Sequence, residues 1–328
     1  MRAWILDESP GSYRWGEIDT PEPGRDEVRV RPVASALNHM DVWLTKGLPK
    51  PDLPHVPGCD VAGVVDAVGE GVVGVAEGDE VVVNPSVSCR RCHWCLAGES
   101  PYCDEFAILG EEGWGGHAEG VVVPAANVVP RPAGRSWEEC AAYPLATLTA
   151  WRMLRRARLT AGETVLVVGI GGGVAMAALA LAKWSGATVV VTSRDAGKRE
   201  RALALGADAA VDSSADRWDV KADVVVESVG AATWAQSVRS LKKGGRLVLC
   251  GGTSGTKVEL NLPRLWFSQH EVIGSTMGSY GEFDEVTRLV AAGLPVQVDV
   301  VEAIDAYPAA LDRLARGEQM GKIVLRHD

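Results

Sequence analysis

The sequence lacks the features that would place the chain in a membrane, on a nucleic acid or among disordered proteins. No segment approaches the roughly 20 uninterrupted apolar residues of a membrane span, and residues 1–10 contain no apolar signal-peptide core. The formal net charge is −10 and the lysines and arginines are scattered, so no basic face for nucleic acid or an anionic membrane is indicated. We therefore expect a soluble, cytoplasmic protein that binds neither nucleic acid nor membrane.

The pattern of short runs predicts an α/β protein with two domains. With 328 residues, 47% of them hydrophobic and 23% charged, the chain is long enough for about two separate cores. Up to about residue 132, short Val-rich runs punctuated by Gly, Pro and Asp predict a β-barrel or sandwich, with strands at 27–34, 61–68, 79–83 and 120–123. A helical pattern over 136–157, interrupted by Pro144, marks the domain boundary.

Beyond this boundary, strands and helices alternate as in a doubly wound parallel sheet. We expect strands at 164–168, 188–192, 209–211, 223–227, 246–250 and 271–274, and helices at 174–185, 196–205, 231–242 and 263–268. Residues 212–223 are too few for a full crossover helix. The tail, with helices around 283–292 and 308–316 and strands at 296–301 and 322–326, is assigned back to the first domain.

Residues 165–175 form the centre of the second domain: a short apolar strand, a turn made almost wholly of glycine, and the start of a helix. Such a helix N-terminus binds a pyrophosphate through unpaired N–H groups and the helix dipole. Read as G-x-G-x-x-G, the motif lacks its last glycine, because Val174 stands there; the spacing Gly169, Gly172, Ala175 fits better. The candidate phosphate-binding residues are Gly169, Gly171, Gly172, Gly173 and Val174, and a purely structural turn is the alternative.

Four of the seven cysteines are crowded into one loop. Three have C-x-x-C-x-x-C spacing and the fourth follows shortly, which suits a closed tetrahedral Zn²⁺ site of structural type. The predicted ligands of one zinc per chain, in a lobe at about 86–106, are Cys89, Cys92, Cys95 and Cys103. Unligated or redox-active thiols are the alternative, and His93 is expected to be only a loop residue.

Taken together, these features resemble the zinc-type medium-chain dehydrogenase/reductase superfamily over essentially the whole chain. The resemblance rests on the cysteine lobe, the glycine turn, and the segments Gly78-Asp-Glu-Val81, Gly115-Gly-His-Ala-Glu119, Leu203-Ala-Leu-Gly-Ala-Asp208, Gly244-Gly-Arg-Leu247, Gly274-Ser-Thr-Met-Gly278 and Gly321-Lys-Ile-Val-Leu325. It implies an NAD(P)-dependent oxidoreductase with a GroES-like catalytic domain at 1–144 and 275–328 and a Rossmann domain at 145–274. It also implies a nicotinamide cofactor in the cleft between the domains, a small-molecule substrate, and a homodimer or homotetramer.

The chain departs from the family at the catalytic metal. The three positions that hold a catalytic zinc in the alcohol dehydrogenase branch are Asn38, Cys59 and Leu145 here. Leucine cannot bind a metal, asparagine is a poor zinc ligand, and one cysteine does not make a site. We expect no catalytic zinc; a degenerate second metal site that uses Asp60 and His39 is the alternative.

The missing zinc points to a particular class of acceptor. Hydride transfer to a simple ketone or aldehyde then lacks its usual means of stabilising the alkoxide. In an enone, enoyl thioester or quinone the charge spreads to an enolate oxygen that hydrogen-bond donors can hold. We therefore expect NADPH-dependent reduction of an activated double bond or quinone. The alternatives are an alcohol or aldehyde dehydrogenase with an altered zinc site, and a non-catalytic NADPH-binding protein.

The candidate catalytic residues follow from a second resemblance. The pattern Asn38-x-x-Asp41-x-Trp43 resembles the Asn-x-x-Asp-x-Tyr pattern of metal-free quinone and enoyl reductases. We expect Asn38 to orient or polarise the acceptor and Asp41 to hold the loop, whereas Trp43 can stack but cannot donate a phenolic proton, so the proton donor is open. Cys59 lines the pocket or is a small buried hydrophobe. His39 binds the pyrophosphate, as in some relatives, or is a solvated loop residue.

The choice of dinucleotide rests on a missing carboxylate. NAD-binding folds place an acidic residue about 20 positions after the glycine turn, but Ser193 stands here, followed by Arg194 and then Lys198. Arg194 can pair with a 2′-phosphate, Lys198 adds a charge, and Asp195 is expected to cap the next helix. NADP(H) is the predicted cofactor; if these cations only form a solvated helix face, the site is indifferent to the phosphate.

Two further strand ends complete the predicted cofactor site. By the crevice rule for parallel sheets, residues after the fifth and sixth strands are expected to meet the nicotinamide. These residues are Gly251, Gly252, Thr253, Ser275, Thr276 and Met277.

Overall fold

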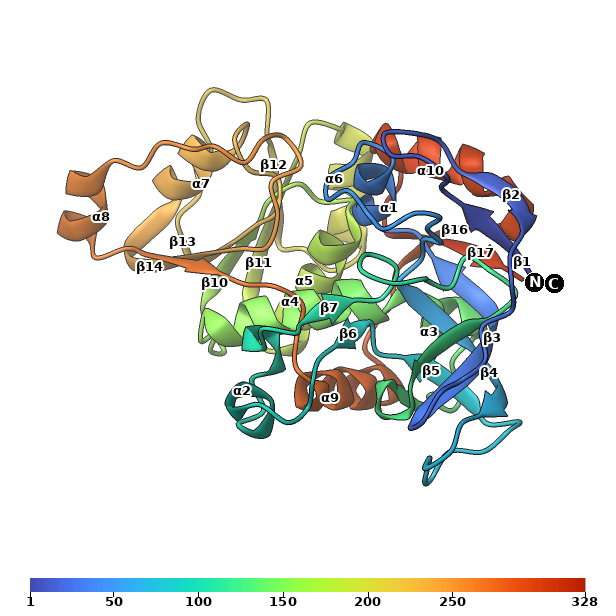
Figure 1. Cartoon of the computed structure of the whole chain (residues 1–328). Coiled ribbons are helices and arrows are strands. Elements are labelled where there is room, and N and C mark those ends of the chain that lie inside the picture. The colour runs from blue at the N-terminus through green and yellow to red at the C-terminus, as the bar shows by residue number, and fades with distance from the viewer. Residues whose placement is uncertain (328) are drawn as a thin grey trace. The chain divides into compact units, whose positions relative to one another are not determined.

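The computed structural model describes residues 1–327 and divides into two compact units. Unit 1 comprises Met1–Leu145 and Gly278–Asp328, and unit 2 comprises Ala146–Met277. Figure 1 traces both units along the chain. Among residues 1–327, no helix is both long and apolar enough to cross a bilayer.

Unit 2 is built on a six-stranded, wholly parallel sheet with the order β12-β11-β10-β13-β14-β15. The order reverses between β10 and β13, as in a doubly wound sheet, so the predicted α/β fold class is confirmed. The strands are β10 (Thr164–Val167), β11 (Thr188–Ser193), β12 (Ala209–Asp212), β13 (Ala222–Glu227), β14 (Leu241–Leu249) and β15 (Glu271–Gly274). The helices that belong wholly to this unit are α5 (Gly173–Trp184), α6 (Ala196–Ala204), α7 (Trp234–Arg239) and α8 (Leu262–Ser268).

Valines make the strands of this sheet, because β-branched side chains fit a sheet that is covered on both faces. Val165, Val167, Val189 and Val191 are fully buried, and so is most of β13. The connection from β12 to β13 contains no helix in its described residues 213–221, as expected. Trp218, only 4% exposed, anchors that connection in the core of the unit.

For unit 2, the sequence predicted the wrong end points for one helix and one strand. The helix expected at 231–242 is only α7, and β14 begins at Leu241 rather than 246. The early start is accommodated by a register shift against β13 and by Gly244, whose φ of +73° is in the left-handed region. Glycine permits this irregularity, so the glycine pair lies within the strand instead of ending it.

Unit 1 is organised around a seven-stranded sheet with the order β16-β17-β3-β4-β5-β9, in which β8 also pairs with β3. Its strands are β3 (Glu27–Ala36), β4 (Asp60–Val68), β5 (Glu80–Val83), β8 (Val121–Pro124), β9 (Val128–Pro130), β16 (Val298–Ala303) and β17 (Lys322–Arg326). The pair β1 (Arg2–Ile5) and β2 (Arg14–Glu17) and the pair β6 (Ser86–Val87) and β7 (Ala107–Ile108) form two small sheets. Buried valines of β3, β4, β5 and β8 form the core of this unit.

The C-terminal segment belongs to unit 1 through its strands. β17 pairs antiparallel with β3 and parallel with β16, and the register places Val324 opposite Ala36. This pairing brings the start of β17 beside the end of β3, which leads directly into α1 (His39–Leu44). The remaining helices are α2 (His93–Leu96), α3 (Trp137–Ala142), α4 (Pro144–Arg156), α9 (Tyr280–Ala291) and α10 (Tyr307–Ala315), with short 3₁₀ turns at Ser100–Tyr102, Ala125–Asn127 and Ile304–Ala306.

The helical segment predicted at 136–157 is two helices, with the break at Pro144 as expected. Ser136 caps α3 by accepting a hydrogen bond from the backbone N–H of Glu139, and the Glu139 carboxylate accepts one from the backbone N–H of Ser136. Proline has no N–H to donate, so it is tolerated as the first residue of α4.

Candidate functional site

The end of the loop after β3 and the first turn of α1 place Asn38 and Asp41 in the interior of unit 1. Asp41 is fully buried, and its Oδ2 accepts a hydrogen bond of 2.7 Å from the backbone N–H of Asn38. A carboxylate near a helix N-terminus is favoured by the helix dipole. Asp41 therefore holds the loop, as the sequence favoured, and fixes the backbone of Asn38.

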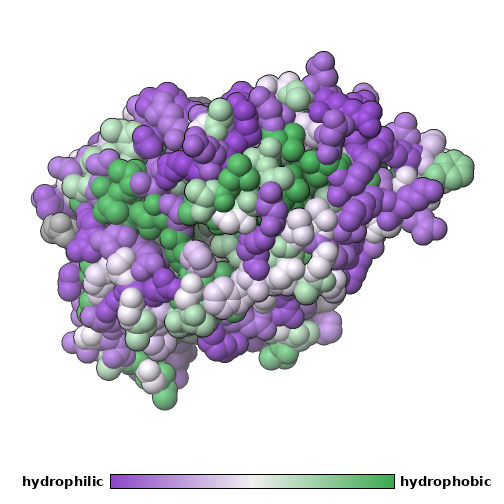
Figure 2. All heavy atoms as spheres, turned by 180° about the vertical axis from the view of Figure 1, so that it is seen from behind, coloured by the Kyte–Doolittle hydropathy of each residue, from purple (hydrophilic) through white to green (hydrophobic). Residues whose placement is uncertain are grey.

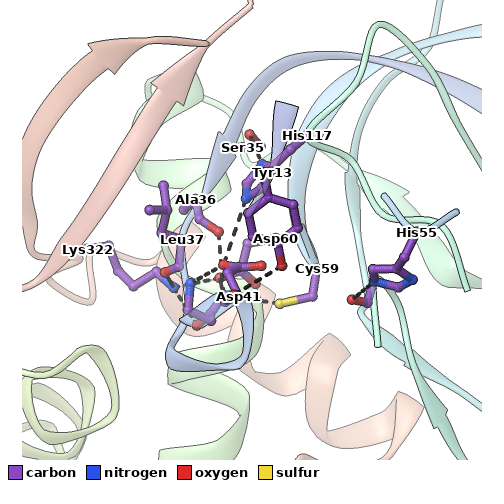
Figure 3. Close-up of polar contacts among 12 residues, drawn as sticks. Tyr13, Ser35, Ala36, Leu37, Asp41, His55, Cys59, Asp60, His117 and Lys322 are labelled. Atoms are coloured by element: carbon purple, nitrogen blue, oxygen red, sulfur yellow. Dashed lines mark hydrogen bonds and ion pairs between the residues drawn. The ribbon is translucent and has the colours of Figure 1, made fainter. Parts of the chain in front are cut away.

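The side-chain amide of Asn38 is committed to buried partners. Figure 3 labels two of these partners, Cys59 and Asp60. Its Nδ2 donates to Oδ2 of Asp60 at 2.9 Å and to Sγ of Cys59 at 3.1 Å. The amide has only two N–H hydrogens, and its O and N positions are fixed because the nitrogen faces acceptors. Asn38 is 9% exposed. Hydrogen bonds to buried groups of unit 1 therefore hold the side-chain amide of Asn38 in one orientation.

Lys322, the first residue of β17, completes this cluster and was not identified from the sequence. Its ammonium donates to Oδ1 of Asn38 at 2.6 Å, to Oδ2 of Asp60 at 2.8 Å and to the backbone carbonyl of Leu37 at 2.7 Å. All three N–H donors of the ammonium are used, and the side chain is 6% exposed. Buried charges require such partners. The signals in the sequence were the segment Gly321-Lys-Ile-Val-Leu325, which is part of the family resemblance, and a lysine directly before an apolar run.

Cys59 and Leu145 occupy the two other positions at which the alcohol dehydrogenase branch holds its catalytic zinc. Cys59 is fully buried among the valines of the core, and burial, followed by the charges of Asp60 and Asp41, raises the pKa of its thiol well above the ordinary value. The backbone N–H of Leu145 donates to Oδ1 of Asp60 at 2.7 Å. Asp60 thus receives hydrogen bonds from three sides and belongs to a protein network rather than to a set of metal ligands.

This donor set does not fit a second metal ion. It offers one thiol that burial keeps protonated, an amide and a carboxylate already paired with an ammonium. Within residues 1–327, the only group of three or more His, Cys, Asp or Glu side chains arranged to share a metal is the cysteine lobe. A degenerate site built on Asp60 and His39 is not among such groups.

Behind Asp41 lies a second buried polar cluster, also missed from the sequence. His117 is fully buried, and its Nδ1 lies 2.8 Å from Oγ of Ser35, which lies 2.8 Å from Nε2 of His327. The Nε2 atom of His117 lies 3.8 Å from Oδ2 of Asp41. Figure 3 shows Ser35 and His117 next to Asp41.

The two aromatic residues of α1 lie beside this region. His39 is the first residue of the helix and is half-buried; burial, with the nearby charges of Lys322 and Lys46, lowers the pKa of its ring. Its ring centroid lies 6.1 Å from that of Trp43, which is also half-buried. Neither is a solvated loop side chain. Their parts in cofactor or acceptor binding stay predictions.

The four lobe cysteines converge as the spacing predicts. The sulfur atoms of Cys89, Cys92, Cys95 and Cys103 all lie within 4.8 Å of one another. Such a cluster is compatible with a structural zinc. His93, expected in a loop, is instead the first residue of the one-turn helix α2, and its ring packs on Trp94 at 4.8 Å.

The backbone of the lobe prepares Cys89 to be a thiolate. Arg90 has a φ of +59°, and the turn it makes directs the N–H of Cys92 to Sγ of Cys89 at 3.4 Å. Hydrogen bonds from the backbone, that of Arg91 first, lower the pKa of Cys89 to about 6. The thiolate is the form that binds metals.

The glycine turn in unit 2 has the conformation that requires glycine. Gly169 and Gly171 have φ of +75° and +124°, whereas Gly172, the N-cap of α5, has an ordinary φ of −72°. A Cβ on Gly169 would lie 2.6 Å from Val229, but a Cβ on Gly172 would meet nothing within 4 Å. The turn is tied to β11 because Gly169 donates to Oγ1 of Thr192. Open space at Gly172, beside the free N–H groups of α5, suits a phosphate.

The end of β11 carries the predicted selectivity residues. Ser193 is buried and its Oγ accepts a hydrogen bond from the backbone N–H of Asp195, while Arg194 is exposed. Asp195 caps α6 by accepting from the N–H of Lys198, as expected. Arg199, which the sequence did not mark as a site residue, donates to the backbone carbonyl of Ser193 at 2.7 Å. Two guanidinium groups therefore lie at this strand end.

The other strand ends of unit 2 lie at the same edge of the sheet, because all six strands are parallel. Glu227 ends β13 fully buried, and it accepts hydrogen bonds from the N–H groups of Val229 and Gly230 and from the Thr233 and Ser237 hydroxyls. The predicted residues after β14 and β15 are half-buried or exposed, except for the buried Met277; they are Gly251, Gly252, Thr253, Ser275 and Thr276.

The structure thus groups the candidate residues into three sets. Asn38, Asp41 and Cys59 form one buried network in unit 1. The four cysteines form a second cluster in the same unit, and the glycine turn, Ser193 and the later strand ends share one sheet edge in unit 2.

Known protein families match both parts of the chain. Residues 24–133 match the alcohol dehydrogenase GroES-like domain. Residues 173–292 match the zinc-binding dehydrogenase family.

Similar proteins include both reductases and dehydrogenases. The chain is 32% identical to the acryloyl-coenzyme A reductase of Metallosphaera sedula, over 99% of each chain. A solved NAD-dependent alcohol dehydrogenase is 41% identical over 100% of each chain, with a TM-score of 0.95. A 2-octenoyl-CoA carboxylase reductase, solved with NADP and 2-octenoyl-CoA, is 29% identical over 96% of this chain and 82% of that one, with a TM-score of 0.90.

Proposed function

This chain belongs to the medium-chain dehydrogenase/reductase superfamily of oxidoreductases, and on that premise we propose that it is an NADPH-dependent reductase of an activated carbon–carbon double bond that uses no catalytic metal. The preferred acceptor is an enoyl thioester, because similar proteins include an acryloyl-CoA reductase and a reductase solved with 2-octenoyl-CoA. Enones are chemically equivalent acceptors, and a quinone is the more distant one.

The single observation that carries this proposal is the donor set around Asn38. At the positions of the three expected zinc ligands the chain has an amide, a protonated thiol and a leucine, and the local positive charge comes from Lys322. Without a Lewis acid, a simple carbonyl is a poor hydride acceptor, whereas a conjugated one places its charge on an enolate oxygen.

Asn38 is the proposed donor to that oxygen. The hydrogen bond from the Lys322 ammonium to Oδ1 draws electron density from the amide and makes its N–H groups stronger donors. Of its two N–H groups, the one directed at Cys59 has the weaker acceptor, since a thiol sulfur binds hydrogen poorly. We expect the acceptor oxygen to take over this N–H while Asp60 keeps the other.

The proposed cofactor is NADP(H), which supplies the hydride when bound. Gly172 leaves room for the pyrophosphate at the N-terminus of α5. Exposed Arg194, with Lys198 on the first turn of α6, suits a 2′-phosphate better than a ribose hydroxyl. Because a solved NAD-dependent alcohol dehydrogenase is also similar to the chain, the test of this preference compares NADPH with NADH.

We assign one structural zinc per chain to the cysteine lobe. The four sulfur atoms are close enough to share one ion, and the backbone already favours the thiolate of Cys89. With four protein ligands the site is closed, so this ion would hold the lobe rather than act on the substrate.

We also propose a homodimer formed through unit 2. β15 is the last strand of the sheet and has an unpaired edge. Next to it, α8 exposes large apolar side chains, among them Trp266 at 57% and Phe267 at 78%. Figure 2, which views the molecule from behind, shows hydrophobic side chains in several places among hydrophilic ones. Unpaired edges and exposed apolar patches of this kind favour association.

The rival function is an alcohol or aldehyde dehydrogenase with an altered metal site, and its support is the similarity to a solved alcohol dehydrogenase. The experiment that separates the two is a matched assay on metal-analysed protein. It follows NADPH oxidation with crotonyl-CoA, an enone and a quinone, and NAD(P)⁺ reduction with primary and secondary alcohols. Cofactor binding without turnover on either panel would instead support a non-catalytic binding protein.

A further inference from the structure

One buried carboxylate in unit 2 organises the loop between β13 and α7. Glu227, the last residue of β13, is fully buried. Its Oε1 accepts hydrogen bonds from the backbone N–H groups of Val229 at 2.7 Å and Gly230 at 3.0 Å. Its Oε2 accepts from the hydroxyls of Thr233 at 2.9 Å and Ser237 at 2.6 Å. A buried carboxylate needs several such partners, and here all four belong to the loop and the start of α7.

Gly230 is the point at which this loop packs against the loop after β14. Its φ of +92° lies in the region that favours glycine. A Cβ on Gly230 would lie only 2.4 Å from the carbonyl oxygen of Gly255 and 2.8 Å from Cα of Gly252. Because Glu227 holds the N–H of Gly230, the carboxylate fixes the residue at which the two loops approach most closely.

Hydrogen bonds join the same two loops. The carbonyl of Val229 accepts from the backbone N–H of Ser254 at 2.8 Å and from its hydroxyl at 2.7 Å. That hydroxyl in turn accepts from the backbone N–H of Ala232 at 3.0 Å. The N–H of Ala231 donates to the carbonyl of Gly255 at 3.1 Å. The conformation that Glu227 imposes on the first loop is therefore passed to the second.

The joined loops lie at the edge of the sheet where the cofactor is proposed to bind. A Cβ on Gly169 would lie 2.6 Å from Cγ2 of Val229, so the loop after β13 contacts the glycine turn. The turn is also held from β11, because the N–H of Gly169 donates to Oγ1 of Thr192. In a doubly wound sheet a dinucleotide crosses the switch point, which here lies between β10 and β13. With the 2′-phosphate at the end of β11, the nicotinamide half lies over the loops after β13 and β14.

We infer that Glu227 is a positioning residue for the nicotinamide half of the cofactor, and that it acts through Gly230 and the joined loops. The inference rests on the proposed function, because it takes NADPH to bind at this edge. The sheet itself does not depend on this side chain, since β13 pairs with β10 and β14 through its backbone. Loss of the carboxylate should therefore disturb the two loops and leave the adenosine half of the site intact.

The inference is tested by titrating purified variants with two probes. NADPH occupies both halves of the site, whereas adenosine 2′,5′-bisphosphate carries both phosphates of the adenosine half and no nicotinamide. Glu227→Leu leaves the N–H groups of Val229 and Gly230 without their acceptor. We expect it to weaken NADPH binding at least about tenfold and to change bisphosphate binding less than about threefold. A general loss of structure would weaken both probes alike.

Two milder variants keep the test decisive if Glu227→Leu does not fold. Glu227→Gln retains a side-chain oxygen for the two N–H groups, so NADPH affinity should stay within about threefold of the native value. Ser254→Ala removes hydroxyl bonds between the loops at an exposed position, where the core is not affected. We expect Ser254→Ala to weaken NADPH about threefold or more and to leave bisphosphate binding unchanged.

The matched control is Asp223→Asn, at the opposite end of the same strand. Asp223 is half-buried, and its Oδ2 accepts from the backbone N–H of Thr164 at 2.8 Å and from the ammonium of Lys242 at 2.7 Å. It is thus also a hydrogen-bonded carboxylate of β13, but it lies at the amino end. Both probes should bind Asp223→Asn as they bind the native chain.

The outcomes separate this inference from the proposed function. Equal weakening of both probes in Glu227→Leu and Ser254→Ala, or native NADPH affinity in both variants, would overturn the positioning role. An effect of Asp223→Asn on NADPH as large as that of Glu227→Leu would overturn it as well. A native chain that binds both probes but reduces no activated acceptor would overturn the proposed reduction alone.

Discussion

The ammonium nitrogen of Lys322 lies 2.6 Å from the side-chain oxygen of Asn38, although 284 positions separate the two residues in the chain. The contact exists because β17 pairs with β3 and so delivers Lys322 to the loop that carries Asn38. It fixes the amide that we propose to bind the acceptor, and it makes the cluster dependent on one buried charge.

Replacing Lys322 by methionine is expected to destabilise the protein by about 3–5 kcal/mol, because it leaves the buried Asp60 carboxylate without its cation. Urea unfolding measures this. Adding Asp60→Asn should restore part of the loss.

The matched control is Lys183→Met. Lys183 also pairs with an aspartate, Asp208 at 2.8 Å, but at the surface, and we expect a change of about 1 kcal/mol or less. If Lys322→Met and Lys183→Met lowered the free energy of unfolding equally, burial of the Lys322–Asp60 pair would not increase its contribution to stability.

Gly172→Ala separates a phosphate site from a structural turn. A Cβ at Gly172 meets no protein atom within 4 Å and φ is ordinary, so folding should be unaffected. A bound pyrophosphate needs that space, so we expect NADPH binding to weaken at least tenfold, measured by fluorescence titration. Gly113→Ala, also without a neighbour, is the control. Full NADPH affinity in Gly172→Ala would favour the structural turn.

Gly169→Ala should behave in the opposite way. Its φ of +75° and a Cβ only 2.6 Å from Val229 predict a stability loss of about 1–3 kcal/mol, whatever the ligand. Thermal unfolding without cofactor is the measurement, and an unchanged midpoint would contradict the strain.

Arg194→Ala tests the dinucleotide preference. A charge-assisted hydrogen bond to the 2′-phosphate contributes about 1.5–3 kcal/mol, which is roughly 10- to 100-fold in kcat/KM for NADPH. NADH, which lacks the phosphate, should be affected little. Lys183→Ala, at the far end of α5 from the glycine turn, is the control. If both cofactors lose equally, Arg194 does not recognise the phosphate.

The cysteine lobe is tested by metal analysis. The native chain should hold one zinc, and Cys92→Ser should lose it together with thermal stability, because four ligands close a structural site. Cys140→Ser, a buried cysteine outside the lobe, should keep its zinc. A native protein that folds and unfolds identically with and without zinc would contradict a structural role.

The proposed dimer through the edge of β15 is tested by measuring the molar mass with light scattering. Val272→Lys places a charge on this strand and is expected to give monomers, since lysine on an edge strand opposes pairing. Val73→Lys, at the 92% exposed Val73 of unit 1, should leave the mass unchanged. A native chain that is monomeric contradicts the proposed dimer.

The sequence predicted the features that depend on contacts between residues close together in the chain. The alternating strands and helices of unit 2 follow from valine runs and helix caps, and the cysteine cluster follows from its spacing. The ends of β14 could not be predicted in this way, because the sequence does not show that Gly244 lies in a bulge rather than a turn.

The polar interior of unit 1 was only half predicted. Asn38 is the N-cap of α1, Asp41 lies in the first turn of that helix and Cys59 directly precedes β4, and the sequence pointed to all three. Lys322 and the histidines behind Asp41 come from distant segments, and no periodicity shows which buried polar residues will meet. Long-range strand pairing decides these contacts.

The most direct test of the central claim is zinc content measured on the same preparation used for turnover. The account predicts one zinc per chain, NADPH oxidation matched by formation of the saturated thioester from crotonyl-CoA, and no alcohol oxidation. Two tightly held zinc ions together with NAD(P)⁺-dependent alcohol oxidation would contradict it.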